Sequence, residues 1–230
     1  TLKDSLDYAA GVFIQSRFGA EESRLSMRGS GIQRTFHGRG LKLLQDGIPL
    51  NLADGGFDFQ AVEPLSANGV EVFRGANALE YGSTTLGGAI NFLSHTGYDA
   101  PRFSGMFEYG SYESYRSQVA AGDVVGPFDY YASLSLFSLN GYREHSKQGN
   151  QRLFSNIGYQ INPDLETRFY FTYVVTDSEL PGNISKAQLE ADPTKAARSG
   201  VPIFDYINSD WKRDFNILRI ANKTTWKDGD

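Results

Sequence analysis

The sequence predicts an α+β domain over residues 1–98, followed by antiparallel β-strands over residues 99–230. Up to Pro101 the apolar residues form short runs without a common period. Beyond Pro101, apolar and polar residues alternate along whole segments, as they do in a sheet with one apolar face. The connections in this second part also alternate between short and long. These two observations indicate a compact mixed unit that leads into a meander.

The first part is expected to contain only short elements. A capping pattern at Thr1 predicts a helix over Thr1–Ala10, with Leu2 and Leu6 on one face. The pair Asp46-Gly47 predicts a tight turn. Short β-like runs are expected at 12–15, 24–28, 41–45, 70–73 and 89–93, and helical pieces at 60–66 and 77–81.

The second part predicts six strands. They are expected at 103–111, 114–121, 128–140, 150–161, 165–177 and 213–226. The apolar set that would share the outer face is Tyr130, Leu134, Ile157, Phe169, Phe171 and Tyr173. The set that would face inward is Arg152, Asn156, Arg168 and Tyr170. Tilted strands of about 9–11 residues can cross a bilayer, but a soluble sheet with one buried face has the same period. The pattern alone therefore supports a membrane sheet and a soluble sheet equally.

Composition excludes several function classes. The net charge of −5 gives no reason to expect nucleic acid as a partner. The absence of cysteine excludes disulfides and thiolate metal sites, and no apolar run reaches the ~18 residues of a membrane helix. His37, His95 and His145 lie far apart, without metal-ligand spacing. No catalytic arrangement is recognisable, so neither an enzyme nor a cofactor is expected.

Ordered motifs between residues 24 and 91 resemble those of a known family. Arg24–Gly29 (RLSMRG) and Leu41–Pro49 (LKLLQDGIP) resemble the first conserved block of the plugs of TonB-dependent outer-membrane receptors. The second block is similar to Val70–Gly75, Ala78–Gly82 and Leu86–Asn91. In addition, residues 179–185 (ELPGNIS) resemble a loop of ferric-siderophore or ferric-citrate receptors.

The resemblance implies an α+β plug domain followed by antiparallel transmembrane β-barrel strands, with the plug lodged inside a 22-stranded barrel. The implied location is the bacterial outer membrane. The implied function is energy-coupled import of a scarce ligand, a ferric siderophore or ferric citrate. Its partners would be the iron chelate, the TonB energy-coupling protein in the periplasm, and outer-membrane lipid.

Parts that the family carries are missing from this sequence. Six strands cannot close such a barrel, and no energy-coupling box precedes the plug motifs. We therefore expect a fragment, with an N-terminally incomplete plug over 1–98 and a C-terminally incomplete barrel over 99–230.

A second function remains open. A non-transporting surface receptor or adhesin with a plugged barrel would have the same motifs. An energy-coupling box in the full-length sequence would favour transport, whereas a signalling domain would add sensing.

Two arginines of the plug motifs are candidates for holding the plug in place. Arg28 and Arg74 each precede a glycine, and the resemblance implies that they form ion pairs with carboxylates on the inner barrel wall. Guanidinium groups bind carboxylates through two parallel hydrogen bonds, which suits such an interface. The alternative is that each is a surface arginine in a turn. The adjacent pair Glu21-Glu22 is interpreted as part of a solvated polar loop.

The segments Ile32–Gly40 and Asn51–Phe59 are the candidate ligand loops, because the resemblance implies that they face the extracellular vestibule. Their donors and positive charges would suit an anionic iron chelate. The candidate residues are Gln33, Arg34, His37, Arg39, Asn51, Asp54 and Phe57. The alternative is that these side chains are merely solvated.

Overall fold

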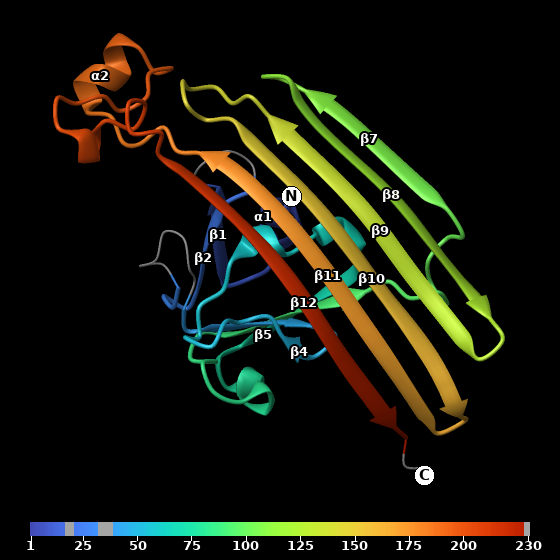
Figure 1. Ribbon diagram of the computed structural model, residues 1–230. Helices are drawn as coiled ribbons and strands as arrows, with labels where there is room; N and C mark the ends of the chain where they lie inside the picture. Colours follow the sequence, from blue (N-terminus) through green and yellow to red (C-terminus); the bar gives the residue numbers. More distant parts are fainter. Residues whose placement is uncertain (17–20, 32–38, 228–230) are drawn as a thin grey trace.

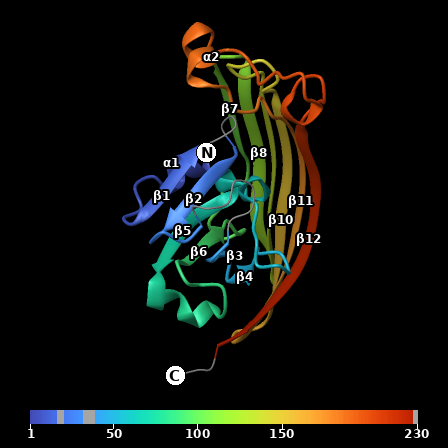
Figure 2. The ribbon, with the colours of Figure 1, turned by 90° about the vertical axis from the view of Figure 1, so that its left-hand side faces the viewer.

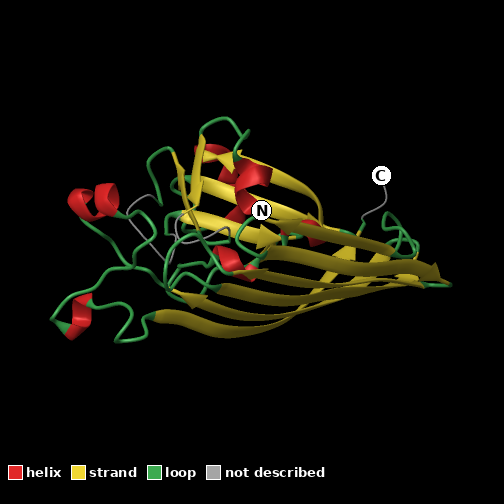
Figure 3. Cartoon of the chain, turned by 90° about the horizontal axis from the view of Figure 1, so that it is seen from above, coloured by secondary structure: helices red, strands yellow, loops and turns green. Residues whose placement is uncertain are grey.

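The computed structural model describes residues 1–16, 21–31 and 39–227. Its N-terminal part lies on the concave face of a long, curved six-stranded sheet (Figures 1 and 2). Seen from above, the small sheets and helices of the N-terminal part all lie on this one face (Figure 3). The two parts thus differ in architecture as their sequence patterns predict.

The N-terminal part contains a hairpin and a four-stranded mixed sheet. The hairpin joins β1 (Val12–Ser16) and β2 (Ser23–Met27). The mixed sheet has the order β4-β3-β6-β5. Its strands are β3 (Leu41–Gln45), β4 (Ile48–Pro49), β5 (Ala67–Arg74) and β6 (Gly88–Ser94). In this sheet β3 and β6 run parallel, and β6 runs antiparallel to β5.

The helical pieces of this part differ in length from the prediction. The helix α1 spans Leu2–Leu6 and is capped by Thr1, whereas the sequence predicted Thr1–Ala10. It ends early because the amide of Ala9 bonds back to the carbonyl of Leu6 and Gly11 follows at a φ of +78°. The other helical pieces are 3₁₀ turns at Phe59–Ala61, Pro64–Ser66 and Gly75–Tyr81.

The turn between β3 and β4 fits its residues. Asp46 and Gly47 both have positive φ, at +53° and +82°, as a two-residue hairpin turn requires. The predicted turn is confirmed. The core of the N-terminal part lies between the mixed sheet, the hairpin and α1, where Leu6, Met27 and Leu43 are fully buried.

The second part is an antiparallel meander of neighbouring strands, as predicted. Its strands are β7 (Ser104–Gly110), β8 (Ser114–Val125), β9 (Phe128–Leu139), β10 (Gln148–Asn162), β11 (Leu165–Glu179) and β12 (Lys212–Trp226). The strand β8 is longer than expected, because pairing with β9 continues to the last pair, Val125 with Phe128. The turn is therefore Gly126-Pro127 alone.

The meander is called the wall below. Its two faces carry the side chains that the alternation predicts. Ile157 and Phe169 are 53% and 57% exposed on the outer face, whereas Arg152 is 2% exposed on the inner face. The remaining outer residues of the predicted set are exposed, and the remaining inner residues are buried. The predicted assignment of faces is therefore confirmed. Within the described ranges, no helix is long and apolar enough to span a membrane.

The ends of the wall are unequal. Short turns join the strands at one end. Residues 140–147 and 180–211 form the long connections at the other end. The longer one carries α2 (Lys186–Ala191) and a 3₁₀ turn at Pro202–Phe204. It folds into the compact lobe at the upper left of Figure 1.

Candidate functional site

The N-terminal part is joined to the wall by a buried group of ion pairs. Arg152 on β10 binds Glu21 through Nη2, at 2.7 Å, and Glu63 through Nη1, at 3.2 Å. Its Nε donates to the carbonyl of Gln60 at 2.8 Å. Arg116 on β8 binds the other oxygen of Glu21. Two strands of the wall thus converge on one carboxylate of the N-terminal part.

The interpretation of Glu21-Glu22 as a solvated loop is wrong. The two residues are 5% and 3% exposed. They immediately precede β2, and this end of β2 lies against the inner face of the wall, where the arginines are. Burial by itself would raise the pKa of Glu21, but the charges of Arg152 and Arg116 outweigh it and lower that pKa.

Further contacts join the two parts along β12. Arg213 pairs with Asp58, and its Nη1 lies 3.6 Å from a carboxylate oxygen of Glu22. Farther along the strand, Arg219 donates to the carbonyl of Leu50 and Lys223 donates to the carbonyl of Asp46. The cations of these contacts belong to the wall, and the acceptors belong to the N-terminal part.

Arg28 and Arg74 occupy a different place from this interface. Both are exposed in the structure. Arg74 donates to the carbonyl of Ala10 at 2.8 Å, and the Arg28 guanidinium lies where a side chain at residue 75 would project. Neither forms an ion pair among the described residues. Their pairing with carboxylates elsewhere on a closed barrel stays a prediction.

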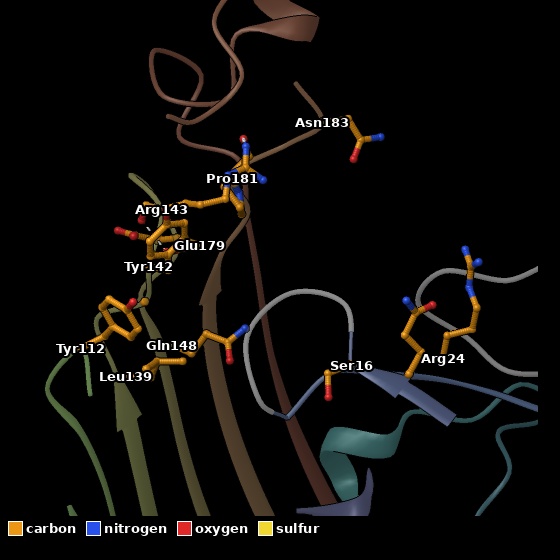
Figure 4. A pocket seen from close by; sticks show the side chains of 13 residues that line it. Ser16, Arg24, Tyr112, Leu139, Tyr142, Arg143, Gln148, Glu179, Pro181 and Asn183 are labelled. Atoms are coloured by element: carbon orange, nitrogen blue, oxygen red, sulfur yellow. Dashed lines mark hydrogen bonds between the residues drawn. The ribbon is translucent and has the colours of Figure 1, made fainter. Parts of the chain in front are cut away.

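A cavity of about 670 Å³ lies between the β1–β2 hairpin and the end of the wall that carries the long connections (Figure 4). Volumes of about 300–1,000 Å³ are usual for small-ligand sites. The hairpin contributes Gln15, Ser16 and Arg24. The wall and its connections contribute Tyr112, Leu139, Gly141, Tyr142, Arg143, Ser146, Gln148, Glu179, Pro181 and Asn183.

The chemistry of this cavity suits a polar ligand with oxygen acceptors. Amide, hydroxyl and guanidinium groups offer donors from both sides, and Glu179 is the carboxylate among the lining residues. Tyr112 and Tyr142 meet edge to face, with ring centroids 5.6 Å apart, and form an aromatic side of the cavity. In such a site the tyrosine rings can pack on the rings of an organic ligand, while the donors form hydrogen bonds to its oxygen atoms.

The candidate ligand residues of the sequence do not line this cavity as far as the structure describes them. Gln33, Arg34 and His37 lie outside the described residues. Arg39 forms an exposed ion pair with Asp54, with Nη2 and Oδ2 2.7 Å apart. Ligand contact by all of these residues stays a prediction.

Asn51 and Phe57 have visible structural roles. The Asn51 amide accepts from the amide of Leu43 and donates to the carbonyls of Leu41 and Gly55. Phe57 is 1% exposed and packs edge to face on Phe59 in the core of the N-terminal part. Both side chains therefore fix the loop that follows β4.

The cavity contains residues that sequence reasoning missed. Gln15 and Arg24 were assigned to predicted strands, Arg24 also to the first plug motif, and Ser16 to neither, because no sequence pattern at the end of a strand separates a ligand contact from a solvated residue. The motif at 179–185 was the useful indication, since Glu179, Pro181 and Asn183 line the cavity.

The fold and this interface define a class of protein in which a small α+β unit is seated on the inner face of a β-sheet wall. Residues 1–89 match the family model described as TonB-dependent Receptor Plug Domain. The N-terminal part is accordingly identified as a plug domain of the TonB-dependent receptor type, and it is called the plug below.

Curated relatives agree with this identification. The chain is 26% identical over 226 residues to the Rhizobactin receptor of Rhizobium meliloti (strain 1021), covering 86% of this chain and 29% of the relative. It is 25% identical over 247 residues to the Iron-regulated outer membrane virulence protein of Vibrio cholerae serotype O1 (strain ATCC 39315 / El Tor Inaba N16961), covering 98% and 34%. The chain thus spans about a third of the length of these relatives.

Solved structures share the fold. The unliganded ferric citrate transporter FecA superposes with a TM-score of 0.64 at 20% identity, covering 81% of this chain and 30% of that one. The ferripyoverdine receptor of Pseudomonas aeruginosa superposes with a TM-score of 0.57 at 20% identity, covering 77% and 23%.

Proposed function

We propose that this chain belongs to a receptor that imports a ferric chelate, a ferric siderophore or ferric citrate, across the outer membrane. Energy would come from the TonB protein in the periplasm. The carrying observation is the cavity between plug and wall, at the end where the long connections lie. Relatives named as a rhizobactin receptor and a ferric citrate transporter support this class of ligand.

The wall would continue into a 22-stranded barrel around the plug. Residues 1–98 would form the plug unit and residues 99–230 the first barrel strands. Both β7 and β12 are edges of the sheet, and an open edge in hydrocarbon leaves backbone groups without hydrogen bonds. Further strands on each side would satisfy these groups and enclose the inner face.

The cavity suits a chelate whose outer surface consists of oxygens and organic rings. Arg24 supplies positive charge from the plug, and Gln15 and Asn183 supply amide groups from opposite sides. Because both parts contribute residues, a bound ligand would contact the plug and the wall at once. Binding of the ligand would thereby act directly on the plug.

The test is binding and uptake by the full-length receptor. We expect at least one of three ferric chelates, a citrate, a trihydroxamate and a triscatecholate, to bind in preference to its iron-free chelator. Arg24→Gln should weaken that binding, whereas Arg102→Gln, at an exposed site of the wall, should not. Radiolabelled iron should enter cells only when TonB is present.

Two outcomes would contradict the proposal. If none of the three chelates binds the folded receptor, the ligand class is wrong. If a chelate binds but iron uptake is absent in cells with an active TonB, the receptor captures its ligand without transport.

A further inference from the structure

Three consecutive residues of the 140–147 connection all reach into the 180–211 connection. Arg143 contacts the backbone near its beginning, Glu144 contacts its middle, and His145 contacts its end. The Nε2 of His145 is 2.8 Å from the carbonyl oxygen of Trp211. Glu144 binds Lys195 at 2.9 Å and Arg198 at 3.3 Å. The contacts of this tripeptide therefore span almost the whole length of the longer connection.

Arg143 differs from the other two in its partners. Its guanidinium makes four hydrogen bonds, and the acceptors are main-chain carbonyls. Nη1 donates to Gly182 at 2.8 Å, Nη2 donates to Lys195 at 2.8 Å and Pro181 at 3.3 Å, and Nε donates to Lys195 at 3.0 Å. Across the described ranges it has no ion pair with a carboxylate. Burial lowers the pKa of Arg143.

These bonds join two turns that are distant in sequence. Pro181 and Gly182 enter the connection from β11, whereas Lys195 follows α2. The carbonyl of Pro181 also accepts from the amide of Ala197, so the two turns already lie side by side. The planar guanidinium fits between them and satisfies carbonyls that would otherwise face the cavity or water.

Arg143 and Pro181 also line the cavity. Arg143, Pro181 and Asn183 form part of its side opposite the plug hairpin, as Figure 4 shows. Arg143 uses its donors on the backbone, which leaves it little capacity to bond a ligand directly. Asn183, one residue beyond the bonded carbonyl of Gly182, has its amide free to face the cavity.

We propose that Arg143 is a positioning residue, which fixes the 180–211 connection as one side of the ligand cavity before the ligand arrives. This inference rests on the proposed function. Its consequence is that binding does not have to order that connection, and ordering costs affinity. It also gives the motif at 179–185 a specific role, because the carbonyls of Pro181 and Gly182 are the acceptors that Arg143 requires.

The test separates geometry from charge in the full-length receptor. Arg143→Lys keeps the positive charge, but its single ammonium group cannot reach all of these carbonyls at once. Arg143→Met removes both the charge and the hydrogen bonds. Nitroxide labels at Leu189→Cys on α2 and Glu80→Cys on the plug report the position of the connection without any ligand. Both sites are exposed. These 230 residues contain no cysteine to compete for the label. The matched control is Arg102→Lys, whose side chain is exposed and pairs with Asp123 at the turn end.

We expect both Arg143 variants, and not the control, to broaden the distribution of label distances. Affinity for the ferric citrate, trihydroxamate or triscatecholate that binds should fall about tenfold in both, the scale of ordering a few side chains on binding. A lysine variant with wild-type affinity would overturn the inference in favour of a charge effect. Weaker binding with unchanged label distances would overturn it in favour of direct ligand contact. If no chelate binds the wild-type receptor, the proposed function fails, and unchanged label distances would still overturn the positioning role.

Discussion

At the scale of the residue, the contact that defines the interface is the one between Glu21 and two arginines. A carboxylate buried at this depth stays ionised only if cations and hydrogen bonds replace its water. Arg152 and Arg116 do so from β10 and β8, two strands of the wall that have β9 between them. Removing the cations, or the negative charge, leaves the remaining group buried without a partner.

The pH dependence of plug seating follows from Glu21. Its pKa in the folded receptor is lowered below the ordinary value of 4.5. Its stabilising contribution is therefore complete above pH 4.5 and is lost as pH falls through the lower, folded pKa. We expect the protection factors of the β1–β2 hairpin amides, which compare the observed exchange with its intrinsic rate at the same pH, to fall on acidification in this range. Glu21→Gln should exchange faster at neutral pH and lose this dependence. An unchanged profile in that variant would assign the acid sensitivity to other carboxylates.

Sequence reasoning could not identify this residue, and the reason is physical. Two adjacent glutamates before a strand look alike whether water or a distant arginine faces them. Arg152 and Arg168 of the wall were predicted to point inward, because strand alternation fixes the face. Which part of the plug they meet depends on how two separate units dock, and no local pattern contains that information.

At the scale of the element, the strands were largely predictable and the connections were not. Alternation gives each strand its face, and turn residues such as Asp46-Gly47 give its end. The 180–211 connection has neither signal, yet it is compact. Its amides and carbonyls bond one another, as between Tyr206 and Ala197, and the rings of Tyr206 and Trp211 stack at 5.4 Å.

Glycine 182 is the position where this compactness can be tested. It has a φ of +66°, and an added Cβ would lie 2.6 Å from the Tyr206 ring and 2.8 Å from the Cβ of Ala197. Gly182→Ala should therefore destabilise the connection by about 1–3 kcal/mol, through backbone strain together with overlap. The matched control is Gly200→Ala in the same connection, where an added Cβ meets nothing within 4 Å. Limited proteolysis should cut the first variant faster than the second. Equal rates would show that the connection tolerates the overlap.

At the scale of the whole molecule, the plug rests on the wall through buried ion pairs and hydrogen bonds, together with an apolar contact of Ile48 with the wall cluster that contains Tyr131 and Phe154. Its apolar core is internal and lies among its own strands and helix. The fold class, the order of strands and the face of each were accessible from sequence, because they depend on local period and turns. The carboxylates of the plug that meet the wall arginines were not accessible, since the motifs drew attention to Arg28 and Arg74 on the plug rather than to Glu21 and Glu63.

The seating of the plug should depend on Arg152 in particular. Arg152→Met leaves Glu21 with a single arginine and Glu63 with no cation, and loss of one partner of a buried pair costs about 3–5 kcal/mol. We expect the plug to loosen, so that cells become more permeable to small antibiotics that do not use the receptor. Arg102→Met, which removes an exposed ion pair, should leave permeability unchanged. Equal permeability of the two variants at matched surface abundance would mean that other contacts hold the plug.

The cations of this interface lie on the wall and the carboxylates lie on the plug. Moving the plug away therefore changes the charge of the space that it leaves. Arg168 keeps its partner when the plug moves, because Asp129 belongs to the same wall. Arg116, Arg152 and Arg213 each lose a carboxylate that leaves with the plug, although Arg116 also lies 4.0 Å from Glu108 of the wall. A plug displaced by force therefore opens a passage whose side carries cations that have lost the carboxylates of the plug. An anion in that passage meets the charges that the plug has just released, so the departure of the plug also creates the electrostatic attraction that would draw an anion inward.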